Sequence, residues 1–67
     1  MKLTVNGRDH LADADDLSVA ALVERLTEAR RGVAVAVNGT VVPRSTWDAV
    51  PLADGDRVEV LTAAQGG

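Results

Sequence analysis

The residues at the end of the sequence could take part in chemistry through the main chain rather than through side chains. Gly66 and Gly67 follow Gln65, and a terminal carboxylate on Gly67 could itself be the reacting group. Glycine has no side chain to obstruct entry into a narrow channel, and its backbone adopts conformations that other residues avoid. The same dipeptide also fits a frayed end without chemistry, because chain termini are often disordered. The dipeptide alone leaves both interpretations open.

Conventional catalytic groups are few in this sequence. There is no cysteine, which excludes disulfides, thiolate metal sites and a thiol nucleophile. The one histidine, His10, is interpreted with Asp9 and Asp13 as part of a solvated surface rather than a metal site. Ser18 is explained by helix capping, and Ser45 has no base beside it in the sequence. We therefore expect this chain to hold no catalytic residue, no metal and no cofactor. We also expect that it is not an enzyme that acts alone.

The charge of the chain limits the classes of partner. Its formal net charge is −3, and its seven Lys and Arg residues are scattered, whereas nucleic-acid binding requires clustered basic residues. No apolar run approaches the ~20 residues that span a bilayer. The first residues lack the apolar core of a signal peptide. The sequence predicts a cytoplasmic protein, monomeric when free, without nucleic-acid or membrane partners.

The elements that must position the final residues are mostly strands. Alternating apolar residues and turn signals predict strands at 1–5, 8–12, 33–37, 40–42 and 57–61. Asn-Gly pairs at 6–7 and 38–39 are strong hairpin signals, because both residues tolerate the positive φ of a type I′ turn. The segment 44–52 follows Pro43 and contains Pro51, and it is expected to be irregular.

One helix is predicted between the two hairpins. Ser18 is a good N-cap, and Leu17 and Leu22 are spaced to form a hydrophobic staple across it. Gly32 suits the left-handed position after a last helical turn, which predicts a helix of about 13 residues. Its apolar stripe consists of Val19, Leu22, Val23, Leu26 and Ala29.

These elements predict an α+β domain in which one helix lies across one face of a mixed sheet of four to five strands. With the first and last strands paired in parallel, this is the ubiquitin-like β-grasp fold. A ferredoxin-like alternative needs a second helix, and 44–52 is a poor candidate for one. We expect the β-grasp domain to span 1–62 and a flexible tail to span 63–67.

Two surface features are candidates for contact with a partner. If the valines of 33–37 and 57–61 face the helix, Ala34, Ala36 and Leu61 lie on the opposite face as a small apolar patch beside the tail. Ordinary surface alanines explain the same pattern equally well. Trp47, the one aromatic residue, is interpreted as a plug at one end of the sheet rather than an interface anchor.

The sequence resembles a known family over essentially its whole length. The resemblance is carried by VNGTVVPRSTW at 37–47, LADGDRVEV at 52–60 and QGG at 65–67. These motifs resemble the ThiS family, the sulfur carriers of thiamine biosynthesis, and the functional tail shows no departure from the family pattern.

The resemblance implies a β-grasp fold and a cycle of sulfur transfer. A ThiF-type adenylyltransferase would activate the carboxylate of Gly67 with ATP, with Mg²⁺ held by that enzyme. Sulfur from a donor such as a cysteine desulfurase system would displace AMP and leave a thiocarboxylate, and thiazole synthase (ThiG) would accept it. Gly66 would give access, and Gln65 and Ala64 would contact the partner's channel. Catalysis would belong to the partners.

Other functions remain open at this stage. The small subunit of molybdopterin synthase shares the fold and the Gly-Gly end, but resembles 37–47 and Gln65 less well. A sulfur carrier for cysteine synthesis is a further possibility. A β-grasp binding module whose tail has no chemistry belongs to a different class of protein. An independent hydrolase or metalloenzyme fits least, because its residues are missing.

Overall fold

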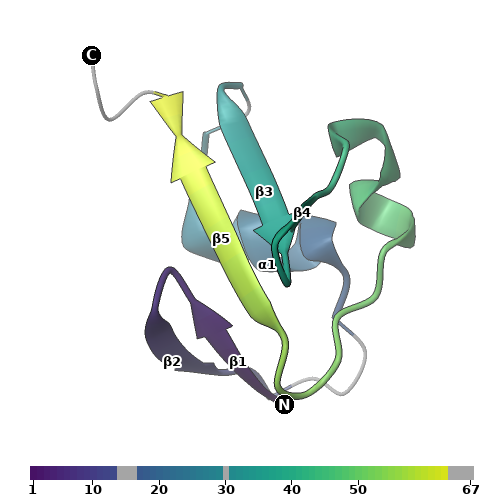
Figure 1. Cartoon of the computed structure of the whole chain (residues 1–67). Helices are drawn as coiled ribbons and strands as arrows, with labels where there is room; N and C mark the ends of the chain where they lie inside the picture. Colours follow the sequence, from purple (N-terminus) through teal and green to yellow (C-terminus); the bar gives the residue numbers. More distant parts are fainter. Residues whose placement is uncertain (14–16, 30, 64–67) are drawn as a thin grey trace.

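The computed structural model describes residues 1–13, 17–29 and 31–63, and in these residues five strands, one α-helix and one 3-10 helix form two layers (Figure 1). The helix α1 lies across one face of the sheet, as the sequence predicts. In chain order the elements are β1 (Lys2–Val5), β2 (Arg8–Leu11), α1 (Val19–Leu26), β3 (Val33–Val37), β4 (Thr40–Val41), the 3-10 helix η1 (Arg44–Ala49) and β5 (Arg57–Thr62).

The sheet is mixed, with the last strand at its centre. Its strand order is β2-β1-β5-β3-β4. β1 and β5 are parallel, with Thr4 opposite Arg57, whereas the other neighbouring strands are antiparallel. Parallel pairing of the first and last strands confirms the predicted β-grasp arrangement, and the five strands of the described residues agree with the predicted four to five.

Both Asn-Gly pairs form the predicted hairpin turns. Asn6 and Gly7 have φ values of 51° and 81°, and Asn38 and Gly39 have φ values of 50° and 84°. Positive φ at both central residues is the type I′ geometry, whose twist matches that of the flanking strands. The two turns lie on either side of β5, because β1 and β3 are its two neighbours in the sheet.

The core lies between α1 and the sheet and is made of aliphatic side chains with one tryptophan. Strand residues alternate between buried and exposed along β1 and β5, as a sheet covered on one face requires. Leu17 and Leu22, the predicted staple pair, are both in this core. Its buried members are Leu3, Val5, Ala12, Leu17, Val19, Leu22, Val23, Val35, Trp47, Leu52, Val58 and Val60.

The helix is shorter than the sequence predicts. It begins after Ser18, whose hydroxyl oxygen accepts from the Ala21 N–H (3.1 Å), and it ends at Leu26 after eight residues. Thr27 is extended, with φ −153°, and its hydroxyl oxygen accepts from the Ala29 N–H (3.0 Å). The β-branched Thr27 thus ends the helix by bonding to the backbone locally. Ala29 lies outside the helix, and the prediction of about 13 residues is wrong.

Gly32 has the predicted positive φ but a different position in the fold. Its φ is 69°, and it lies directly before β3 rather than after the last helical turn. Gly32 therefore adopts the left-handed conformation at the residue before β3 and not at the C-terminal end of α1.

The segment around Trp47 is a short 3-10 helix, η1, rather than irregular. Trp47 is only 7% exposed, and its indole N–H donates to the Val42 carbonyl oxygen (2.9 Å). The Arg44 guanidinium lies over the indole ring, 5.5 Å from its centroid. This burial confirms the interpretation of Trp47 as a plug, and η1 packs against α1 without forming a second α-helix in the described chain.

Candidate functional site

The predicted site begins where β5 ends. Ala63 follows β5, and its N–H donates to the Gly32 carbonyl oxygen (2.6 Å). A Cβ on Gly32 would lie 2.9 Å from the Ala63 Cβ, so this close approach requires a glycine. The predicted tail residues Ala64, Gln65, Gly66 and Gly67 lie outside the described residues. The structure therefore places the start of the tail, and the predicted roles of those four residues stay predictions.

Two asparagine side chains bind the central strand, one from each side. The Asn6 amide donates to the Val60 carbonyl oxygen (3.0 Å) and accepts from the Val60 N–H (2.8 Å). On the other side, the Asn38 carbonyl oxygen accepts from the Arg57 N–H (2.9 Å). Both residues were predicted only as turn formers. An amide can donate and accept at once, whereas the Asn-Gly signal reports only tolerance of positive φ.

The predicted patch lies on the face of the sheet away from α1. Ala34 is directly opposite Leu61 in the β3–β5 register, and Leu61 is 66% exposed. Ala36 is half-buried and lies opposite Glu59 on one side and Val41 on the other. The predicted orientation is confirmed. Val41, which is 72% exposed, extends the patch and was not singled out from the sequence.

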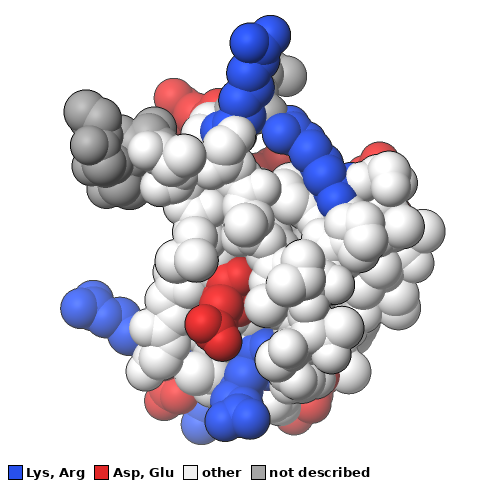
Figure 2. Space-filling model, turned by 45° about the horizontal axis from the view of Figure 1, so that its top comes forward, with Lys and Arg blue, Asp and Glu red and all other residues white. Residues whose placement is uncertain are grey.

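The surface around this face is largely uncharged. Figure 2, tilted from Figure 1, shows a broad uncharged area between charged side chains of both signs at its upper and lower edges, with an acidic side chain near its centre. Such a surface suits a partner that contributes apolar contacts with a polar rim.

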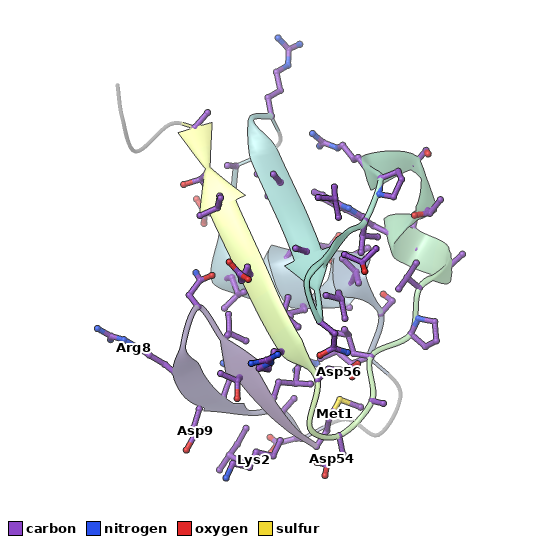
Figure 3. The ribbon with its side chains drawn as sticks, in the orientation of Figure 1. Met1, Lys2, Arg8, Asp9, Asp54 and Asp56 are labelled. Atoms are coloured by element: carbon purple, nitrogen blue, oxygen red, sulfur yellow. The ribbon has the colours of Figure 1, made fainter. Side chains whose placement is uncertain are left out.

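Acidic residues of β2 and of the turn before β5 contact Lys2 and nearby main-chain groups. Asp9 lies near Lys2, with 3.9 Å between the carboxylate oxygen and Nζ (Figure 3). Asp54 accepts from the Lys2 main-chain N–H (2.6 Å), and Asp56 accepts from the Ala53 N–H (2.8 Å). In the described residues no three His, Asp or Glu side chains gather as metal ligands. His10 is half-buried on β2, opposite Leu3.

The sheet is mixed, its β1–β5 pair is parallel, and one helix covers one face. This is the fold of a ubiquitin-like β-grasp protein. The Gln-Gly-Gly sequence after the last strand is the motif of a carrier. The ThiS family model matches residues 2–67. The chain belongs to the ThiS family. No helix in the described residues has the length and apolar character needed to cross a membrane.

Curated relatives and solved structures agree with this membership. The sulfur carrier protein ThiS of Escherichia coli is 34% identical over 50 residues, which are 75% of this chain and 76% of that protein. A thiazole synthase of Paramagnetospirillum magneticum is 37% identical over all 67 residues, and this chain spans only 20% of it.

The thiamine biosynthesis protein ThiS of Geobacter metallireducens has a similar structure. Its crystal structure is 42% identical with a TM-score of 0.83, and the match covers 92% of this chain and 93% of that one. Its solution structure is 43% identical with a TM-score of 0.79, covering 91% and 81%.

Proposed function

We propose that this chain is a sulfur carrier protein of thiamine biosynthesis and that the carboxylate of Gly67 carries the sulfur. The observation that supports this most directly is the family match, which runs through residue 67 and takes in the Gly-Gly end after β5. The sulfur carrier of Escherichia coli supports it as well. Within this proposal the chain is a co-substrate, and its partners are the catalysts.

The proposed chemistry needs activation because a carboxylate is a poor acyl donor. An oxygen of the Gly67 carboxylate attacks the α-phosphorus of ATP, which forms an acyl-adenylate and releases pyrophosphate. A hydrosulfide that then attacks the acyl carbon displaces AMP and leaves a thiocarboxylate. A persulfide donor gives an acyl disulfide instead, and a thiol must then reduce it to release the thiocarboxylate. ATP and Mg²⁺ belong to the activating enzyme, not to this chain.

Three partners follow from this cycle. A ThiF-type adenylyltransferase activates Gly67, a cysteine desulfurase system supplies sulfur, and thiazole synthase accepts it. The similarity between this whole chain and a stretch of a thiazole synthase supports the third. The side-chain-free Gly66 and Gly67 fit a narrow channel, and Ala64 and Gln65 contact its entrance.

The apolar patch (Ala34, Ala36 and Leu61) is the proposed docking surface for these partners. Leu61 lies two residues before Ala63, so a partner that receives the tail also reaches the patch. Changing Leu61→Asp puts a charge into this surface and is expected to weaken binding to the adenylyltransferase about tenfold or more in calorimetric titration.

Leu11→Asp is the matched control for the patch. Leu11 is 78% exposed and lies on edge strand β2, two strands away from β5. We expect Leu11→Asp to bind as the native protein does. Equal affinity of the Leu61→Asp and native proteins contradicts the docking role of the patch and leaves the tail chemistry standing.

Intact-mass spectrometry tests the proposed function. The mass of the native protein first shows whether Gly67 carries a free carboxylate. Incubation with ATP, Mg²⁺, a ThiF-type enzyme and sulfide is expected to add the difference between one sulfur and one oxygen. A variant without Gly67 should gain nothing. No gain on the native protein, with an enzyme active on another carrier, contradicts the proposal.

The acceptor is tested in the same way. Transfer to thiazole synthase is expected to return the carrier to its carboxylate mass. Transfer to the large subunit of molybdopterin synthase, and not to thiazole synthase, would move the function to the molybdopterin pathway.

A further inference from the structure

The C-terminal half of β5 has a neighbouring strand on one side only. β1 pairs with β5 at Thr4–Arg57 and Val5–Val58 and then ends at Val5, whereas β5 continues to Thr62. Figure 1 shows β5 extending past the β1–β2 hairpin, with β3 beside it on the other side. One edge of β5 is therefore left without a strand over its last residues.

Alternation along β5 determines which main-chain groups face this edge. Carbonyl oxygens of the even-numbered residues point toward β1, where Asp56 accepts from Thr4 and Val58 accepts from Asn6. Val60 is the next even-numbered residue, and the Asn6 side chain satisfies both its N–H and its carbonyl. The Asn6 amide thus takes the place of one further residue of β1.

Thr62 is the next residue with main-chain groups on the same edge. On the β1 side, the structure gives its N–H and carbonyl no partner in the described part of the chain. The odd-numbered residues bond to the opposite side, where Ala63 donates to Gly32 and Arg57 accepts from Asn38. Among the residues that the structure describes, none takes up the Thr62 N–H or carbonyl, which lie at the spacing of a strand edge.

A groove lies beside these groups. The volume of this groove is about 470 Å³. The edge groove passes from the end of α1 to the first hairpin turn, and none of its lining residues is charged. They are Val5, Asn6, Leu26, Thr27, Val60, Leu61 and Thr62.

We propose that this edge pairs with an extended main-chain segment of the adenylyltransferase, which adds a strand to the sheet at Thr62. An extended backbone supplies both an acceptor for the Thr62 N–H and a donor for its carbonyl, and alternate apolar side chains fill the uncharged groove. Asn6 already occupies the groups of Val60, so pairing starts at Thr62 and the register is fixed. The adenylyltransferase is the assigned occupant because Gly67, whose carboxylate it activates in the proposed function, follows Thr62 by five residues, so an enzyme that holds this carboxylate lies within about 18 Å of the Thr62 edge. This inference rests on the proposed function.

A proline at position 62 tests the pairing directly. Because the Thr62 N–H faces the open edge, Thr62→Pro removes no hydrogen bond to β3. We expect Thr62→Pro to bind the adenylyltransferase about tenfold or more weakly in calorimetric titration. Thr62→Ala keeps the N–H and is the matched control, with affinity expected within about threefold of native. A folded Thr62→Pro protein that binds as the native one does overturns the proposal.

Amide hydrogen exchange on the native chain decides the question even if Thr62→Pro fails to fold. The Thr62 N–H is expected to exchange quickly in the free protein and slowly in the complex, whereas Leu61 is already protected by β3. Fast exchange at Thr62 in the complex overturns the proposal, and so does protection by thiazole synthase alone. Thiocarboxylate formation on the native protein in the mass assay is independent of both outcomes, so the proposed function can stand while the strand pairing falls.

Discussion

Asn6 is a residue whose backbone and side chain serve the same strand in different ways. Its positive φ makes the first hairpin turn, and its amide binds both main-chain groups of Val60. Asn38 also makes a hairpin turn, and from the other side of β5 its side-chain oxygen accepts from the Arg57 N–H, while its main-chain N–H donates to the Arg57 carbonyl. The two asparagines therefore hold β5, the strand that leads to the tail, from both of its edges.

Replacing Asn6 by glycine separates its two roles. Asn6→Gly keeps the turn, since glycine tolerates φ 51°, and removes the two hydrogen bonds to Val60. We expect a loss of about 1–2 kcal/mol in the free energy of unfolding. The Val60 amide should exchange faster. Asn38→Gly is the control, with faster exchange at Arg57 and no change at Val60. Equal exchange of Val60 in native and Asn6→Gly proteins contradicts this role.

Gly32 carries a steric requirement beside the start of the tail. Gly32→Ala combines the strain of φ 69° with a Cβ placed 2.9 Å from the Ala63 Cβ. Gly55→Ala has the same kind of strain, at φ 90°, with open space around its Cβ. We expect about 1–2 kcal/mol of destabilisation for Gly55→Ala and more for Gly32→Ala. Urea unfolding measures both, and equal midpoints argue against the close approach to Ala63.

At the scale of elements, α1 shows what a sequence pattern can and cannot determine. Its start is predictable because Ser18, Leu17 and Leu22 act locally, through a cap and a staple. Its end is not, because Ala29 continues the apolar spacing although the chain has to turn back toward β3. Thr27 decides this end by leaving the helix and bonding to Ala29. The start of a helix, which a local cap determines, is therefore easier to predict from the sequence than its length, which depends on the tertiary structure.

The cap of α1 contributes measurably because the helix is short. Ser18→Ala removes the acceptor of the Ala21 N–H and is expected to cost about 1 kcal/mol of unfolding free energy. Ser45, exposed in η1, supplies the matched control, and Ser45→Ala is expected to be neutral within about 0.5 kcal/mol. Thermal unfolding followed by circular dichroism compares them. A neutral Ser18→Ala variant would show that the tertiary packing of α1 makes the cap dispensable.

The candidate site was predictable where it depends on alternation along strands. Valines at every second position placed Ala34, Ala36 and Leu61 on the face opposite α1, and the register then set Ala34 against Leu61. The bonds from Asn6 to Val60 were not predictable, because they join residues 54 positions apart. They depend on where β1 ends relative to β5, which follows from the whole sheet rather than from the sequence near either residue.

At the scale of the whole molecule, the exposed and buried faces of one sheet have separate roles. The inner face packs on α1 and holds the core, whereas the outer face carries the apolar patch within a largely uncharged surface. A 67-residue chain has a small core, and native domains have only about 0.05–0.15 kcal/mol of stability per residue. Substitutions on the outer face can therefore test binding, while those on the inner face test folding.

Two leucines provide the clearest contrast between these faces. Leu22 is fully buried on α1, and Leu22→Ala is expected to cost about 2–5 kcal/mol, a large part of the total stability. Leu61→Ala removes a side chain that is mostly in solvent, and we expect a change within about 0.5 kcal/mol. Since about 1 kcal/mol lowers the melting temperature of a domain of this size by roughly 4–8 °C, Leu22→Ala should melt about 10 °C or more below Leu61→Ala. Circular dichroism measures both. Similar melting temperatures for the two variants would mean that the outer face contributes to folding as the inner one does, and the separation of roles would be wrong.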